Sequence, residues 1–217
     1  MNIFLDTNVI IGYIYSLDAL HSSSRKAIVR KSNNYYSFHV NQEVICVSRR
    51  KDREYSKFLI ELGKIFNRYG DNDFIDLSEI HIKVNQFGQI GKLEVDNMHL
   101  AVDAFKVKTE FNNYSQNFES KHRKCRINCL NEMTCIPAYQ NKDSNVLEVI
   151  EKKSLRDYFH GEDEDILFDV HEYLKNNPIS DLTFISNDKD FIKVISKLIN
   201  VLSFNRYMYL GDFSEFS

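Results

Sequence analysis

The chain opens with Asn2-Ile3-Phe4-Leu5-Asp6-Thr7-Asn8, a short apolar run that ends in an aspartate flanked by small polar residues. Near the other end, Phe184-Ile185-Ser186-Asn187-Asp188 repeats the pattern. Buried parallel strands are almost continuously apolar, and the residues that follow them gather at the carboxyl edge of the sheet. The two stretches therefore predict an α/β fold in which Asp6 and Asp188 share one site at that edge.

Helical and extended patterns alternate through both outer parts of the chain, which is typical of a parallel sheet covered by helices. We expect a three-layer α/β/α domain with a central, mostly parallel sheet of four to five strands. The predicted strands are 2–5, 35–38, 182–186 and 201–204, and the predicted helices are 9–14, 22–31, 40–47, 55–69, 93–107, 163–174 and 191–198.

The middle of the chain differs in composition. Residues 108–144 are rich in Asn, Ser, Lys, Arg and Cys and hold no long periodic stretch, which indicates an insertion or a surface excursion. We expect one domain over residues 1–217, with a helical insertion at about 92–150.

The composition favours a folded protein that binds nucleic acid only through a local surface. Of its 217 residues, 43% are hydrophobic, and the formal net charge is −3. Arg49, Arg50, Lys51 and Arg53 form a basic run just beyond Glu43 that could follow a phosphate backbone, or could equally be a solvated helix face. A second basic run at 121–126 allows the same two interpretations.

The cysteines and the absence of a long apolar stretch favour a reducing compartment. Three of the four cysteines, Cys125, Cys129 and Cys135, crowd together in a pattern that fits free thiols better than a disulfide framework. With His122 they could form a zinc site, but the paired spacing of zinc knuckles is missing, so free thiols are favoured. No apolar stretch reaches the ~18 residues of a membrane span. We expect a soluble, cytoplasmic protein that has no membrane partner.

The order and surroundings of the acidic residues resemble those of the PIN-domain family of metal-dependent nucleases. Leu5-Asp6-Thr7-Asn8-Val9 is similar to the family's first acidic motif, and Glu43 lies where the family carries a glutamate on the helix after the second strand. Ser186-Asn187-Asp188-Lys189-Asp190-Phe191 is similar to the last motif, with Ser in place of Thr. The resemblance covers roughly residues 1–60 and 155–205.

Three residues compete for the third acidic position. Positions three, four and seven after Asp163 are apolar, so Asp163 begins a core-facing helical stripe, whereas Asp165 does not. Asp96 also begins a helix-like stretch, but it lies 92 residues before Asp188, against 25 for Asp163. We favour Asp163, with Asp165 as a second ligand or a neighbour of the ligands.

The resemblance implies an endoribonuclease that hydrolyses phosphodiester bonds of single-stranded or structured RNA. Mg²⁺ or Mn²⁺ would be held by Asp6, Glu43, Asp163, Asp165 and Asp188, because hard cations prefer carboxylate oxygens. Asn8, Ser186 and Asn187 would orient water or phosphate, and Asp190 would support the ligands from outside. A homodimer stays open, and an antitoxin partner is not favoured because the chain is longer than the family's compact toxins.

Two other functions fit parts of the pattern. A phosphatase that forms an aspartyl phosphate also carries an acid after its first strand, but it needs a second aspartate two residues later, where this chain has Asn8. A family member without catalysis would bind RNA or a protein through the same surface. The full set of four acids favours the nuclease.

Overall fold

The computed structural model describes residues 1–15, 18, 20–29, 32–73, 104–177, 179 and 181–212. Within these ranges, no helix combines the length and the apolar character that crossing a membrane requires. Asp96 and most of the helix expected at 93–107 lie outside the described residues.

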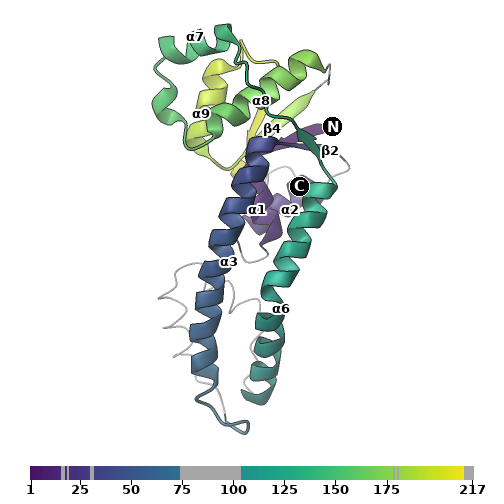
Figure 1. Ribbon diagram of the computed structural model, residues 1–217, viewed down its shortest axis with the longest axis vertical. Helices are drawn as coiled ribbons and strands as arrows, with labels where there is room; N and C mark the ends of the chain where they lie inside the picture. Colours follow the sequence, from purple (N-terminus) through teal and green to yellow (C-terminus); the bar gives the residue numbers. More distant parts are fainter. Residues whose placement is uncertain are drawn as a thin grey trace.

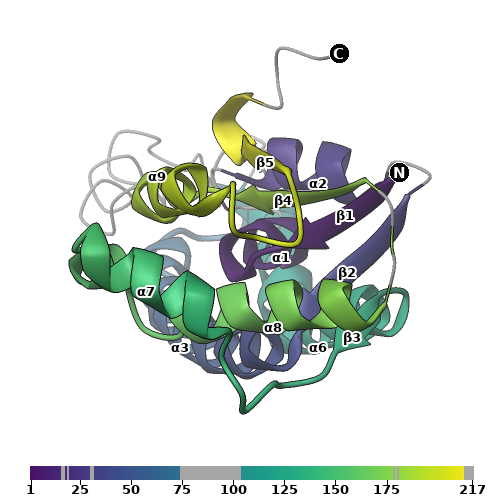
Figure 2. The same cartoon turned by 90° about the horizontal axis from the view of Figure 1, so that it is seen from above.

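The centre of the fold is a five-stranded sheet in which every pairing is parallel (Figure 2). Its order is β3-β2-β1-β4-β5, and the strands are β1 (Asn2–Leu5), β2 (Asn33–Ser37), β3 (Thr134–Ile136), β4 (Leu182–Ser186) and β5 (Arg206–Tyr209). In the central pair, Leu5 lies opposite Ile185. The predicted α/β class and mostly parallel sheet are therefore confirmed, and the residues after β1 and β4 lie at the same edge.

Helices cover both faces of the sheet (Figure 1). α7, α8 and α9 lie on one side and α1 and α2 on the other. The described helices are α1 (Thr7–Ile14), α2 (His21–Val29), α3 (Phe38–Phe66), α6 (Ala104–Asn131), α7 (Ser144–Lys152), α8 (Asp163–Asn176) and α9 (Lys189–Leu198), with a short 3-10 turn at Arg156–Tyr158.

Aromatic rings hold the sheet against α9. Phe184 in β4 is fully buried and stacks on Phe4 in β1, with ring centroids 4.9 Å apart. Phe204 stacks on Phe184 at 5.7 Å, and Phe191 of α9 meets it edge-on at 5.3 Å. This cluster fixes β1 and β4 relative to each other, and with them the positions of Asp6 and Asp188.

α3 and α6 run side by side and extend away from the sheet (Figure 1). Their contact is aromatic, since Tyr55 of α3 meets Phe118 of α6 at 5.2 Å. Tyr15, directly after α1, joins both helices, because it stacks on His122 of α6 at 4.7 Å and on Tyr55 at 5.7 Å. The sequence predicted two separate helices at 40–47 and 55–69, but α3 is one continuous helix. The polar residues between the two predicted helices continue the helix instead of forming a turn.

Two predictions about local structure were wrong. Residues 108–131 belong to a 28-residue helix, α6, rather than to an aperiodic excursion. The buried residues of α6, among them Phe111 and Phe118, recur seven apart and form a narrow stripe where the helix packs on its neighbours. The rest of the helix surface is polar, so the composition of the segment looks polar. The last strand is Arg206–Tyr209, not 201–204, because an edge strand that is half exposed does not need an apolar run.

Candidate active site

Four of the predicted acids line one cavity of about 350 Å³ at the carboxyl edge of the sheet. Asp6 follows β1, Asp188 follows β4, Asp163 is the first residue of α8, and Glu43 lies on α3 one turn and a half after its start. Four separate segments thus contribute one carboxylate each, and the first and the last come from opposite ends of the chain. Parallel strands make this convergence, since their carboxyl ends open onto the same crevice.

Asp6 is the most buried acid of the cavity, with 3% of its surface exposed. Its Oδ1 accepts a hydrogen bond from the backbone N–H of Thr7 at 2.7 Å, so it caps α1. Its Oδ2 accepts from the Ser186 hydroxyl at 2.5 Å and from the Asn8 amide at 3.0 Å. These donors fix the carboxylate in one orientation.

Asn8 and Ser186 also join the two ends of the chain. The Asn8 side-chain oxygen accepts from the backbone N–H of Asn187 at 2.8 Å, and the Ser186 hydroxyl accepts from the backbone N–H of Asp188 at 2.9 Å. Asp188 in turn caps α9, with Oδ1 accepting from the N–H groups of Asp190 and Phe191. Asn8 and Ser186, which we expected to orient water or phosphate, therefore position Asp6, whereas Asn187 contributes its backbone N–H and its side-chain oxygen has no hydrogen-bond partner among the described residues.

Glu43 and Asp163 are each held by one hydrogen bond. The Thr7 hydroxyl donates to Glu43 Oε2 at 2.6 Å. The backbone N–H of His160 donates to Asp163 Oδ2 at 2.8 Å, across a turn in which Gly161 has a positive φ of 57°. We expected Thr7 either to cap the first helix or to touch substrate, not to hold Glu43, and His160 and Gly161 had no predicted place in the site. The glycine just before an acidic helix start is the signal that could have indicated this turn.

Glu43, Asp163 and Asp188 each keep one carboxylate oxygen that accepts no hydrogen bond from the described residues. Within the described ranges, no hydrogen bond reaches Oε1 of Glu43, Oδ1 of Asp163 or Oδ2 of Asp188. A carboxylate that is oriented through one oxygen and open at the other is suited to bind a hard cation. The set of donors therefore fits Mg²⁺ or Mn²⁺, although no three of the four acids bring their oxygens within 4.8 Å of one another.

Burial and the repulsion between neighbouring carboxylates raise the pKa of two acids in the cavity, Asp6 and Asp163. Burial is the main cause that raises the pKa of Asp6 from 3.8 to about 7, and the charges of Asp163 and Glu43 add to it against the hydrogen bonds from Ser186 and Thr7. Burial also raises the pKa of Asp163 from 3.8 to about 6, with contributions from Asp188 and Glu43. Crowded carboxylates of this kind are stabilised by a cation, which removes the repulsion.

Two predicted acids lie outside the cavity lining. Asp165 Oδ1 pairs with the ammonium of Lys142 at 2.7 Å, and 42% of its side chain is exposed. Asp190 pairs with Lys193 at 2.8 Å. Its link to the site is the hydrogen bond that its backbone N–H donates to Asp188. Of the two aspartates considered at the start of α8, the structure places Asp163 in the cavity and Asp165 at the surface.

The basic run on α3 is divided between the cavity and the surface. Arg50 and Lys51 line the cavity and Arg49 and Arg53 do not, although Arg50 is exposed to solvent like these two. The Lys51 ammonium pairs with Asp18 at 2.7 Å, which reduces its charge toward a ligand. Arg50 is therefore the residue of this run best placed to meet a phosphate in the cavity.

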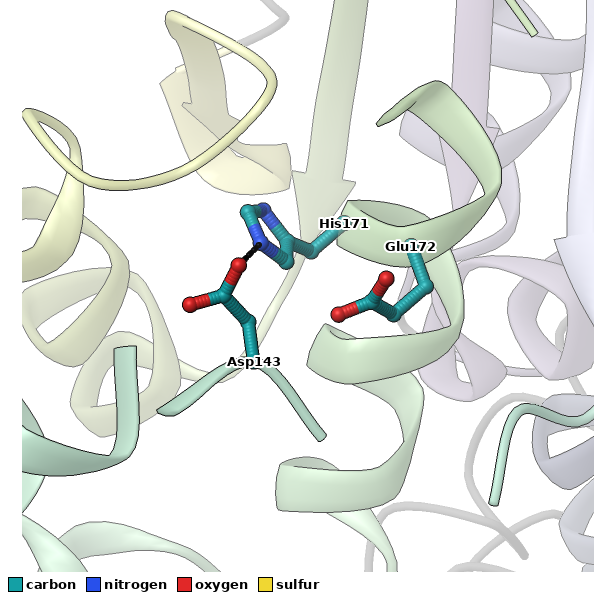
Figure 3. Close-up of side chains that lie close together, drawn as sticks. All are labelled: Asp143, His171 and Glu172. Carbon is teal, nitrogen blue, oxygen red and sulfur yellow. Dashed lines mark ion pairs between the residues drawn. The ribbon is translucent and has the colours of Figure 1, made fainter. Parts of the chain in front are cut away.

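A second cluster of metal-ligand residue types lies away from this cavity (Figure 3). Asp143, His171 and Glu172 have donor atoms within 4.8 Å of one another, and the sequence analysis did not assign them a role. The backbone N–H of Ser203 donates to His171 Nδ1 at 3.0 Å, so the proton of the neutral ring is on Nε2, which faces Asp143 at 3.4 Å.

A lysine already pairs with both acids of this second cluster. The Lys175 ammonium lies 2.6 Å from Asp143 and 3.6 Å from Glu172, and it holds the pKa of the Asp143 carboxyl far below its usual range. A protonated Nε2 cannot bind a metal, and the ammonium competes with a cation for both carboxylates. The cluster therefore fastens α8 to the start of α7 and to the segment before β5.

The proposed zinc ligands do not gather at one point. Among the described residues, His122, Cys125, Cys129 and Cys135 form no set of ligands within 4.8 Å, and all four cysteines are free. His122 instead lies between Tyr15 and Phe118. The preference for free thiols over zinc agrees with this arrangement.

Comparison of the chain with protein-family models, with curated proteins and with solved structures found no match.

Proposed function

We propose that the protein is a divalent-metal-dependent endoribonuclease with a PIN-like site. The observation that carries the proposal is that Asp6, Glu43, Asp163 and Asp188 line one cavity at the carboxyl edge of a parallel sheet. The resemblance of Leu5-Asp6-Thr7-Asn8-Val9 and of the segment around Asp188 to the motifs of that family supports it.

Asp6, Glu43, Asp163 and Asp188 would hold Mg²⁺ or Mn²⁺, and the donor set described above fits either ion. Such an ion, when bound, supplies an activated water and neutralises charge on the phosphate.

Other side chains of the protein would position the metal ligands and attract the RNA. Thr7 holds Glu43, and the pair Asn8 and Ser186 holds Asp6, so that the ligands need little rearrangement. Arg50 at the cavity wall would attract the RNA backbone, which the acids alone would repel. A cytoplasmic location and a homodimer stay predictions.

The two rival functions receive less support. The amide of Asn8 donates to Asp6 and cannot act as the second carboxylate of an aspartate-based phosphatase. A binding module without catalysis would not need three carboxylates with an open oxygen each, because burying acids costs stability.

The test is cleavage of a labelled single-stranded RNA with Mg²⁺ or Mn²⁺. The wild type, Asp6→Asn and Asp188→Asn are compared with Asp157→Asn, which removes an exposed acid outside the cavity. We expect metal-dependent cleavage by the wild type and by Asp157→Asn, and none by the two site variants, with all four proteins equally folded by circular dichroism. Absence of cleavage by the wild type with either ion, or full activity of Asp6→Asn, would overturn the proposal.

A further inference from the structure

A second, smaller cavity of about 230 Å³ lies next to the acidic one, between α1, α2 and α6. Ile11 of α1 lines the acidic cavity, and Ile14, three residues and about 4.5 Å further along the helix, lines the second. Leu20 lines the first and His21, the next residue in the chain, lines the second. The two cavities thus adjoin on either side of the connection between α1 and α2.

The position of α2 against α1 depends on a glycine. A Cβ atom at Gly12 would collide with the Ser24 hydroxyl, so the two helices approach closely only because position 12 has no side chain. The His21 ring then donates through Nδ1 to the Gly12 carbonyl at 2.9 Å, and its other nitrogen is left for the cavity. This close packing places His21 and Arg25 of α2 in one wall of the second cavity.

The second cavity is positively charged, in contrast to the first. Arg25 of α2 and Lys121 of α6 line it, and neither forms an ion pair with a described residue. No aspartate or glutamate is among the lining residues. The carboxylate that acts on Tyr13 in its wall belongs to Glu132, which is exposed to solvent and therefore screened.

The wall also offers rings and a neutral polar group. Tyr13 and His21 are half-buried. His122 is 4% exposed, and its Nδ1 has no hydrogen-bond partner among the described residues. Burial lowers the pKa of His122 to about 4, so its ring is neutral at physiological pH. Cations together with rings and a neutral hydrogen-bonding group are the features that bind a phosphate and its adjoining base in single-stranded nucleic acid.

We propose that this second cavity binds a nucleotide of the RNA strand on one side of the bond that is cleaved. The inference rests on the proposed nuclease function and adds the direction of its substrate: from the acidic cavity, past Ile14 and His21, to Arg25 and Lys121. The volume of about 230 Å³ is below the ~300 Å³ of common small-ligand pockets and suits one nucleotide rather than a larger ligand.

The test is binding of fluorescently labelled single-stranded RNAs of about 3 and about 12 nucleotides. Asp6→Asn is the background, so that no cleavage occurs during the measurement. Into it we introduce Arg25→Gln with Lys121→Gln, or, as the matched control, Arg123→Gln with Lys124→Gln. The control pair removes the same charge from exposed positions of α6 outside the cavity.

We expect the Arg25→Gln and Lys121→Gln pair to weaken binding of the longer RNA at least tenfold. The slope of log K against log salt concentration should become about 1.4 less negative, since each lost phosphate contact contributes about 0.7. The control pair should change binding of either RNA by less than threefold, whereas the Arg25 and Lys121 pair should also weaken the RNA of about 3 nucleotides, because the second cavity adjoins the cleaved bond. Equal weakening by both pairs, or none by the first, overturns the inference even when the wild type cleaves RNA. Absence of both cleavage and RNA binding overturns the nuclease proposal and this inference together.

Discussion

Asn in place of Asp6 should make the metal-free protein more stable at alkaline pH while it abolishes activity. In the folded chain the Asp6 carboxyl has its pKa raised from 3.8 to about 7, mainly by burial. Between about pH 4 and pH 7 the folded state therefore binds more protons than the unfolded state, and the free energy of unfolding falls as the pH rises. Above that window the ionised group costs about 4 kcal/mol, at about 1.4 kcal/mol per pH unit.

The asparagine recovers only part of this cost. Its side-chain oxygen can still accept from the Thr7 N–H, and its amide can donate to the Ser186 hydroxyl, which at present donates to Asp6. The amide also faces the Asn8 amide, so the 3.0 Å hydrogen bond that Asn8 donates to Asp6 is lost. A lost buried hydrogen bond costs about 1–2 kcal/mol. At about pH 8 in EDTA, Asp6→Asn should thus be more stable than the wild type by about 2 kcal/mol, or by about 4–8 °C in Tm.

Urea and thermal unfolding in EDTA at about pH 8 and about pH 4 provide the measurement. The advantage of Asp6→Asn should disappear near pH 4, where the wild-type carboxyl is protonated in the folded state. Saturating Mn²⁺ should raise the Tm of the wild type and not that of the variant, because the ion binds only the folded site. Asp165→Asn, at the surface, serves as control. A variant less stable than the wild type at pH 8 in EDTA would refute the assignment of Asp6 as a strained, buried acid.

Three further outcomes follow from the same geometry. Asp163→Asn should lower RNA cleavage by about two orders of magnitude or more, whereas Asp165→Asn should stay within a few-fold of the wild type in the same assay; equal effects would contradict the choice of Asp163. Thr7→Val should weaken the apparent affinity for Mn²⁺ about 10–100-fold by releasing Glu43, and Thr7→Ser, which keeps the hydroxyl, should restore it; titration of activity against Mn²⁺ decides this, and an unchanged affinity in Thr7→Val would exclude the role. Phe184→Ala should reduce the free energy of unfolding by about 3–5 kcal/mol in urea, since it leaves a cavity between β1, β4 and α9, and a loss below 1 kcal/mol would contradict the packing described.

The outer parts of the chain carry their structure in local patterns. The apolar runs before Asp6 and Asp188 are continuous because both strands are buried on both faces, and this predicted a parallel sheet and its carboxyl edge. Asp163 was recognised from the apolar stripe that follows it. These features depend on residues close together in sequence, so they could be predicted.

The middle of the chain and the supports of the site could not be predicted in this way. α6 packs on α3 and on the end of α1 through a narrow stripe, so its sequence lacks the wide apolar face by which amphipathic helices are recognised. Likewise nothing near Thr7 in the sequence indicates that its hydroxyl reaches Glu43, 36 residues away.

The sequence by itself determined the fold class and the sheet edge at which Asp6 and Asp188 lie. Only the tertiary structure decided that Asp163 and not Asp165 faces the cavity, that Asn8 and Ser186 hold Asp6, and that α1, α2 and α6 enclose a basic cavity beside the acidic one. The physical reason is that strand and helix patterns are set by local burial, whereas the direction of a polar side chain is set by the partners that packing brings to it.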